Sequence, residues 1–246
     1  MDKIALVTGA SSGIGRNAVI SLARAGFTVI ATARSIDGLN ETARLSEGNV
    51  ACIASDVTDL PSVDALFSEI NKRYGRLDVL FNNAGNSLPS INFGDMKFEQ
   101  FKGVIDVNLT GAFLMANRAY RLMRDQSPQG GRIINNGSIS AYMPRPGSAA
   151  YTASKHAISG LTRSIALDGR AHNIACGQID IGNAASDMTT QISQGVPQAD
   201  GSIKGEPTID VQHIGDAVVH MAKLPLEANV LFMNVMATAM PFVGRG

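Results

Sequence analysis

The chain has 246 residues, which suffices for one large α/β domain and is short for an enzyme with a separate substrate domain. Its 21 basic and 21 acidic residues balance, and the basic residues are scattered along the sequence. This distribution excludes the basic footprint of a nucleic-acid-binding protein or of a protein that docks on an anionic membrane surface. We therefore expect a single domain, 1–246, whose partners are small molecules.

The apolar run in "MDKIALVTGASSGIG" is too short for the hydrophobic region of a signal peptide, and no stretch approaches bilayer-spanning length. We therefore expect a cytoplasmic protein. Cys52 and Cys176 each lie in an apolar, strand-like run, which favours buried free thiols over a disulfide. The four histidines have no metal-ligand spacing with cysteines or carboxylates, so we predict no metal site.

Short apolar runs alternate with amphipathic stretches along the chain. The predicted strands cover residues 3–8, 27–33, 49–55, 77–82, 131–138, 173–181 and 229–236. The predicted helices cover residues 17–25, a polar stretch after 33, 62–75, 98–123, the stretch beginning at Tyr151, and 210–224. Alternation of this kind predicts an α/β fold with a seven-stranded parallel sheet and helical crossovers.

Residues 189–207, "TTQISQGVPQADGSIKGEP", break this alternation. The segment is polar, rich in glycine and proline, and without periodicity, so we predict a long loop. Loops of this length in compact domains often cover a site, and a lid over the substrate is our interpretation. A solvated insertion is the alternative.

A glycine-rich turn follows the first predicted strand. In "TGASSGIG", Gly9, Gly13 and Gly15 fall on the turn and on the first residues of the next helix. Glycine permits positive φ and close backbone approach, and the unpaired N–H groups of a helix N-terminus face any phosphate there. Tight packing alone could explain the glycines, but their place inside a βαβ unit indicates dinucleotide binding.

The end of the second predicted strand bears on the choice between NAD and NADP. Ala33 stands where an acidic residue would bond the ribose 2′-hydroxyl of NAD, and Arg34 follows it. An arginine offers a planar fork of donors to a 2′-phosphate, whereas a carboxylate would repel it. Although an arginine that ends a strand in solvent is the alternative, we predict NADP.

Tyr151 and Lys155 are four residues apart in "YTASKHAISG", which places both on one face of a helix. A nearby ammonium group favours the ionised form of a phenol, so the pair suits proton exchange with a ketone or an alcohol. Ser138, at the end of the fifth predicted strand, could donate a hydrogen bond to the same oxygen. A turn hydroxyl is the alternative for this serine.

These residues give the sequence, over essentially its whole length, a resemblance to the single-domain branch of the short-chain dehydrogenases/reductases. The resemblance includes "TGASSGIG", Asp56 and Val57 in "SDVTD", "NNAG" at 82–85, and "VNLTG" around Asn108. Ser138, Tyr151 and Lys155 follow in the family's order and spacing. The resemblance implies a doubly wound Rossmann-type fold, an NAD or NADP cofactor, and a homo-oligomer, either a tetramer or a dimer.

The resemblance also implies roles for single residues. Tyr151 is the implied general acid/base, Ser138 orients the carbonyl, and Lys155 supports the phenol and holds the nicotinamide ribose. Asn108 would hold a water that links Lys155 to solvent. The implied cofactor contacts are Gly9, Ser11, Ser12, Gly13, Ile14, Gly15, Arg34, Asp56, Val57, Asn83, Ala84, Gly85, Tyr151, Lys155, Ile181, Gly182 and Ala184.

Two segments depart from the family's pattern. After the sixth predicted strand, Ile181 stands in place of a proline, although Gly182 and the hydroxyl of Ser186 are kept. Because proline fixes φ, we expect some loss of rigidity in this loop. The carboxyl-terminal "NVMATAMPFVGRG" lacks the family's usual pair of glycines, and we expect this tail to pack against another subunit.

The candidate substrate contacts are Ser140, Met143, Arg145 and Met188, beside the segment 87–93. A sugar, an acyl thioester, a steroid-like ketone or a xenobiotic carbonyl would each suit this machinery. The function that these residues favour is hydride transfer between NADP(H) and a secondary alcohol or ketone. A non-catalytic NADP(H)-sensing or scaffolding protein, and an epimerase or dehydratase that retains its cofactor, are the alternatives.

Overall fold

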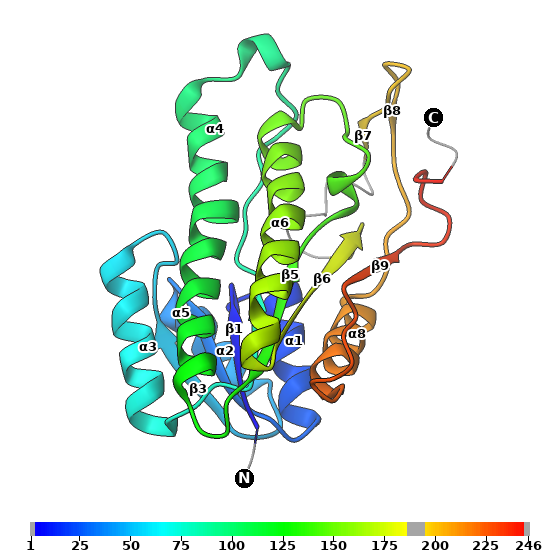
Figure 1. Ribbon diagram of the computed structural model, residues 1–246. Coiled ribbons are helices and arrows are strands. Elements are labelled where there is room, and N and C mark those ends of the chain that lie inside the picture. Colours follow the sequence, from blue (N-terminus) through cyan, green and yellow to red (C-terminus); the bar gives the residue numbers. More distant parts are fainter. Residues whose placement is uncertain (1–2, 186–194, 244–246) are drawn as a thin grey trace.

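A seven-stranded parallel sheet forms the centre of the computed structural model, which describes residues 3–185 and 195–243 (Figure 1). The strand order is β3-β2-β1-β4-β5-β6-β9, and helices cover both faces. This confirms the prediction of a seven-stranded, doubly wound parallel sheet. The strands are β1 (Ile4–Thr8), β2 (Thr28–Ala33), β3 (Val50–Ala54), β4 (Val79–Asn82), β5 (Gly131–Asn136), β6 (Ile174–Gly182) and β9 (Phe232–Met236).

The helices follow the strands as crossovers. The α-helices are α1 (Gly13–Arg24), α2 (Ile36–Arg44), α3 (Leu60–Tyr74), α4 (Phe98–Ile105), α5 (Ala112–Asp125), α6 (Ala149–Asp168) and α8 (Val211–Lys223). A π-helical turn, η2 (Asp106–Gly111), joins α4 to α5. The short 3₁₀ turns are η1 (Phe93–Asp95), η3 (Ile139–Ala141) and η4 (Gly169–His172).

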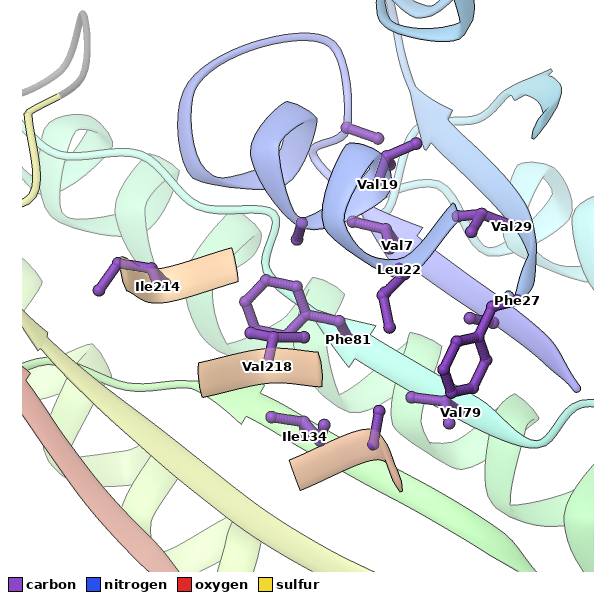
Figure 2. Close-up of a cluster of buried hydrophobic side chains, with 14 of the residues drawn as sticks. Val7, Val19, Leu22, Phe27, Val29, Val79, Phe81, Ile134, Ile214 and Val218 are labelled. Atoms are coloured by element: carbon purple, nitrogen blue, oxygen red, sulfur yellow. The ribbon is translucent and has the colours of Figure 1, made fainter. Parts of the chain in front are cut away.

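The inner strands β1, β2, β4, β5 and β6 are almost wholly buried on both faces, which explains their continuous apolar runs, whereas the edge strands β3 and β9 are partly exposed. Along β1, Ala5 and Val7 belong to one core cluster, whereas Leu6 belongs to the other. The first cluster lies between the sheet and helices α1 and α8, and Figure 2 shows Phe81 of β4 among its side chains, near Val218 of α8. The second cluster lies under α3 and α5.

Two local features differ from the sequence-based expectations. The single helix predicted over 98–123 is divided into α4 and α5 by the π-helical turn η2. The segment predicted as a loop contains a two-stranded antiparallel hairpin, β7 (Val196–Pro197) and β8 (Ile203–Lys204). Residues 189–194 of the predicted lid lie outside the described residues.

The strand order reverses direction at the middle of the sheet. From β1 the chain continues to β2 and β3 on one side, and β4 then pairs with β1 on the other side. At such a switch point, the crevice at the carboxyl ends of the strands is the usual ligand site of a doubly wound fold. The segments after β1, β4 and β5, which hold most candidate residues, all leave the sheet at this edge. Within the described part of the chain, no helix is long and apolar enough to cross a membrane.

Candidate active site

The glycine turn after β1 is shaped by close backbone contacts. Gly9 and Gly13 have φ angles of 65° and 50°, a region that glycine enters without strain. A Cβ atom on Gly15 would lie 2.1 Å from the carbonyl oxygen of Gly9, so only glycine fits against the turn. The turn and the start of α1 therefore hold the compact form that the dinucleotide fingerprint predicts.

The amino terminus of α1 has no side-chain cap. Ser12 is its N-cap residue and its side chain accepts no hydrogen bond from the first turn, whereas the side chains of Ser35, Asp59 and Asp210 cap α2, α3 and α8. The first N–H groups of α1 are thus left for another acceptor, and the helix dipole there favours an anion. This end of α1 fits the pyrophosphate of a dinucleotide.

A line of hydrogen bonds runs along the strand ends from the glycine turn to α6. The Asn83 side-chain amide donates to the carbonyl of Thr8 (2.9 Å), and its oxygen accepts from the Asn136 amide (2.8 Å). The carbonyl of Asn136 in turn accepts from Lys155 Nζ (2.7 Å). The Thr8 hydroxyl also accepts from the N–H groups of Asn83 and Ala84. Polar side chains thus fix three strand ends relative to one another.

Tyr151 and Lys155 lie on the first two turns of α6, as their spacing predicts. Lys155 is 5% exposed, and its Nζ lies 5.5 Å from the centroid of the Tyr151 ring. Among the described residues, none makes a hydrogen bond with the Tyr151 hydroxyl, so that group is available to a ligand. The ammonium group is anchored on β5 while the phenol is left open.

Ser138 follows β5 directly and is 5% exposed. Its Oγ accepts a hydrogen bond from the N–H of Ser140 (3.1 Å), which leaves the hydroxyl proton free to be donated. Its own N–H donates to the carboxylate of Asp180 (2.9 Å). Because α6 packs against η3, the serine turn and the Tyr151 helix are neighbours at the same edge of the sheet.

Asn108 lies in the π-helical turn and is 2% exposed. Its Oδ1 accepts from the N–H of Asn86 (2.8 Å), and its Nδ2 donates to the Asn86 carbonyl (2.9 Å) and to Ser154 Oγ (3.2 Å). The side chain therefore joins the segment after β4 to α6, one residue before Lys155. Gly85 leaves room for this side chain, since a Cβ atom there would make a tight contact of 3.3 Å with Asn108 Oδ1.

Arg34 is exposed just after β2, and within the described part of the chain no hydrogen bond or ion pair occupies its guanidinium group. Hydrogen bonds from the N–H and the hydroxyl of Thr58 hold the pKa of Asp56 below its ordinary value, and the charge of Arg34 adds to this effect. Arg34 and Asp56 therefore lie close enough to interact. Val57 is buried against Gly111 of the π-helical turn.

The loop after β6 is braced although Ile181 replaces proline. Gly182 ends β6, and Asn183 follows with a φ of 52°. The Asn183 carbonyl accepts from the N–H of Ile209 (2.9 Å), and Ala184 forms a parallel bridge with that residue. These bonds fix the described part of the loop, whereas Ser186 lies outside the described residues.

The candidate substrate residues differ in their surroundings. Ser140 is buried within the turn that Ser138 begins, and Met143 is 45% exposed. Arg145 forms an ion pair with Glu206 (2.5 Å) and donates to Asn183 Oδ1 (2.7 Å), so one of its terminal nitrogens is held by protein groups. The position predicted for Met188 lies outside the described residues.

A surface pocket of about 210 Å³ adjoins the amino terminus of α6. It is formed where the segment after β4 meets the segment after η3, and the N–H of Ile91 bonds the carbonyl of Gly147 across this junction. The two segments predicted to surround the substrate are thus neighbours. The lining residues are Ile91, Phe93, Pro144, Arg145, Gly147, Ser148, Ala149 and Thr152.

The carboxyl-terminal tail packs within its own subunit. Ala237 and Met240 are buried in a small cluster with Ile139, and Phe242 contacts the Tyr142 ring edge to face at 6.3 Å. The expectation that this tail also packs against another subunit stays a prediction, and Val243 at its described end is 91% exposed. Among the described residues, no cluster of histidine, cysteine, aspartate and glutamate could hold a metal ion.

Sequence reasoning missed several polar residues of the site. Asp180, which accepts hydrogen bonds beneath Ser138, lies in the apolar run of β6, and Asn86 and Ser154 hold Asn108 in place. Only the sheet register and the helix packing bring these residues to the site, so short-range patterns gave no signal for them.

The similarity of this chain to known proteins agrees with this geometry. The family model described as short chain dehydrogenase matches residues 3–197. A curated relative, 3beta-hydroxysteroid dehydrogenase of Mediterraneibacter gnavus, is 40% identical over 181 residues, which is 72% of this chain and 64% of that enzyme.

Solved structures agree with this match. Acetoin dehydrogenase YohF of Salmonella typhimurium is 33% identical, with a TM-score of 0.80 over 96% of this chain and 94% of that one. A variant of actinorhodin polyketide ketoreductase, solved with NADPH, is 25% identical with a TM-score of 0.86 over 95% of each chain.

Proposed function

The chain belongs to the short-chain dehydrogenases, and on that premise we propose that it transfers a hydride between NADP(H) and a secondary alcohol or ketone. Membership of this family makes it an oxidoreductase of CH–OH and C=O groups that uses a nicotinamide cofactor. The proposal adds NADP as the preferred cofactor and Tyr151 as the general acid/base.

One observation supports the chemistry above all others. Lys155 is anchored on the Asn136 carbonyl beside the Tyr151 ring, while no described residue occupies the Tyr151 hydroxyl. A phenol that only stabilised the fold would be expected to bond a protein partner. A free phenol beside a buried ammonium group is the arrangement of a general acid/base.

Each of the four catalytic candidates then has a task. Tyr151 gives a proton to the ketone oxygen or takes one from the alcohol, and Ser138 donates its free hydroxyl proton to the same oxygen. Lys155, with its ammonium group beside the Tyr151 ring, would hold the nicotinamide ribose. Since its side chain is engaged by Asn86 and Ser154, Asn108 would hold the relay water through its main chain.

The bound cofactor would supply or accept the hydride, and the chain's own residues would hold it in place. The uncapped end of α1, with Ser11, Ser12 and Ile14, suits the pyrophosphate. Val57 and Asn83 to Gly85 would border the adenosine half, and Ile181, Gly182 and Ala184 would border the nicotinamide half. Arg34 would pair with the 2′-phosphate of NADP, because its guanidinium group is exposed and unbound by described residues.

The substrate proposal is a small molecule with an apolar body. The relatives act on a hydroxysteroid, on acetoin and on a polyketide ketone, according to their names, and all three contain a ketone or a secondary alcohol. Ser140 and Met143 are retained as substrate contacts, with Met188. Arg145 would contact the substrate from the wall of the surface pocket, although Glu206 binds one of its terminal nitrogens.

We also propose that the protein works in the cytoplasm as a homo-oligomer, a tetramer or a dimer. Phe98, Phe113 and Leu167 are 69%, 49% and 60% exposed on α4, α5 and α6, where a second copy could cover them. A monomer in light scattering would reject the oligomer.

The experiment that tests the function follows the absorbance of NADPH and NADH with a panel of hydroxysteroids, ketones, diketones and acyl thioesters. Turnover that prefers NADPH is the expected result. Tight cofactor binding with no turnover in either direction would favour the nucleotide-sensing alternative. Product formation without net change in the cofactor would favour an epimerase or dehydratase.

A further inference from the structure

Asp180 lies beneath the turn that carries Ser138, and its exposed fraction is 0%. Its Oδ1 accepts hydrogen bonds from the N–H of Ser138 (2.9 Å) and from Gln178 Nε2 (2.6 Å), and its Oδ2 accepts from the Tyr142 hydroxyl (2.9 Å). All three partners donate, which is the arrangement expected around an ionised carboxylate. An aspartate is rarely buried completely unless hydrogen bonds or a cation compensate its carboxylate for the loss of water.

The backbone makes room for this carboxylate. A Cβ atom on Gly137 would lie 2.0 Å from Asp180 Oδ1 and 2.6 Å from Gln178 Nε2. The residue before Ser138 therefore has to be glycine for the carboxylate to reach the serine N–H. Gly137 also donates its N–H to the carbonyl of Ile179 (2.8 Å), which continues the pairing of β5 with β6 up to this point.

The carboxylate holds both ends of the serine turn. Ser138 begins the turn and Tyr142 ends it, and each donates to a different oxygen of Asp180. Between them, the N–H of Ala141 bonds the carbonyl of Ser138 (2.8 Å). Loss of the carboxylate would leave the buried Ser138 N–H without an acceptor and release Tyr142.

The same carboxylate is linked to the helix of the general acid/base. Gln178 donates to Ser159 Oγ (3.0 Å) as well as to Asp180, and Ser159 donates to the carbonyl of Lys155 (3.4 Å). Burial raises the pKa of Asp180, and the donors together with the charge of Lys155 oppose this increase. Asp180 thus joins the serine turn and α6 through buried hydrogen bonds.

We propose that Asp180 is a positioning residue, which fixes the Ser138 turn so that the serine hydroxyl and the Tyr151 hydroxyl reach one substrate oxygen. This inference rests on the proposed function for its catalytic part. Asp180 would touch neither substrate nor cofactor, and it acts through the main chain of Ser138 and the side chain of Tyr142.

The test compares Asp180→Ala with Asp180→Asn in the full chain. Alanine removes the acceptors, so we expect kcat to fall about tenfold to a hundredfold, as expected for misplaced reacting groups, with NADPH affinity nearly unchanged. Asparagine keeps an oxygen for the Ser138 N–H and should recover most of the lost rate. Equal losses in both variants, or wild-type kcat in Asp180→Ala, would overturn the inference.

Two further variants provide a test that does not depend on the folding of Asp180→Ala. Tyr142→Phe removes the hydrogen bond between Tyr142 and Asp180, and we expect a smaller loss of kcat than in Asp180→Ala. Tyr120→Phe is its matched control, since the Tyr120 hydroxyl bonds only the Asp168 carbonyl at the far end of α6. Equal kcat values in these two tyrosine variants would contradict the role of the Tyr142–Asp180 hydrogen bond in fixing the serine turn.

A second measurement does not depend on turnover. Amide hydrogen exchange, followed by mass spectrometry on peptides covering 137–143, should be faster in Asp180→Ala than in the wild type, with Asp180→Asn closer to the wild type. Unchanged exchange overturns the inference, whatever the activity. A wild-type protein without turnover on any carbonyl overturns the proposed function instead, and the exchange rates then decide whether Asp180 holds the turn.

Discussion

The Nζ atom of Lys155 lies 5.5 Å from the centroid of the Tyr151 ring, and its hydrogen bond goes to the carbonyl of Asn136 rather than to the phenol. The cation therefore lies beside the phenol ring without occupying the hydroxyl, which leaves that group open to a ligand.

Replacement of Tyr151 by phenylalanine tests this arrangement. We expect kcat to fall about a hundredfold to ten-thousandfold, the usual contribution of a general acid/base. The affinity for NADPH, measured by fluorescence titration, should stay within about twofold, because no described residue bonds the lost hydroxyl. A variant that retains wild-type kcat would show that another group handles the proton.

Arg34→Asp should reverse the cofactor preference. The arginine is exposed and unbound by described residues, so its removal should cost the NADPH reaction a charge-assisted hydrogen bond, about tenfold to a hundredfold in kcat/KM. The reaction with NADH should change little or improve. Arg24→Asp is the matched control, since Arg24 is exposed at the end of α1. An unchanged NADPH/NADH ratio in Arg34→Asp would reject the NADP assignment.

The Glu206 carboxylate should contribute a pH-dependent part of the stability. Burial raises its pKa, but hydrogen bonds from Arg145, Asn183 and Gln198 outweigh this and hold the pKa below the ordinary value of 4.5. A carboxyl group whose pKa is lowered by folding stabilises the fold at pH values above its unfolded pKa. That contribution is lost as the pH falls through the lowered, folded-state pKa.

Glu206→Gln should therefore lower the free energy of unfolding by about 2 kcal/mol near neutral pH, because it breaks a buried ion pair with Arg145. The difference from the wild type should shrink below about pH 4. Urea unfolding at several pH values measures both effects. Glu41→Gln is the control, since the exposed Glu41 pairs with Arg44 on the surface of α2. A pH-independent difference would contradict the role given to the ion pair.

The two free thiols should differ in reactivity. Burial raises the pKa of Cys176 to about 12, so almost no reactive thiolate exists at neutral pH. Burial also raises the pKa of the partly buried Cys52, whose thiol bonds the Leu39 carbonyl. A thiol reagent should label Cys52 slowly and Cys176 only after unfolding, with Cys52→Ala and Cys176→Ala identifying each signal. Rapid labelling of Cys176 in the folded protein would show that the β6 core opens.

Local patterns in the sequence sufficed to predict the sheet and the reactive pair. Continuous apolar runs mark strands that are buried on both faces, and a spacing of four residues brings Tyr151 and Lys155 together on any helix. The glycines after β1 are needed for the positive φ angles and close backbone approach of a tight turn, which a glycine-rich motif indicates directly. Each of these features depends on residues that are close along the chain.

The partners of Asp180 and Arg145 could not be predicted in this way. Asp180 bonds the N–H of Ser138, 42 residues earlier, and only the register of β5 with β6 brings them together. Arg145 reads locally as a solvated or ligand-binding loop residue, yet its partner Glu206 comes 61 residues later. The π-helical turn that carries Asn108 lies inside a stretch that the sequence predicts as one continuous helix.

Gly137→Ala tests whether the space between Ser138 and Asp180 is needed. The added methyl group would lie 2.0 Å from Asp180 Oδ1, so the carboxylate or the backbone has to move. We expect a loss of about 1–3 kcal/mol in the free energy of unfolding, as in other overpacked cores, and a reduced kcat.

Gly160→Ala is the matched control for this change, because a Cβ atom at this exposed position on α6 would meet nothing within 4 Å. The same methyl group should there stabilise the protein by about 0.5–1 kcal/mol, since alanine favours a helix over glycine. Thermal and urea unfolding of both variants give the comparison. Changes of the same sign in the two variants would mean that the carboxylate is not fixed beneath Ser138, because a displaced Asp180 would let the methyl group at 137 enter freely.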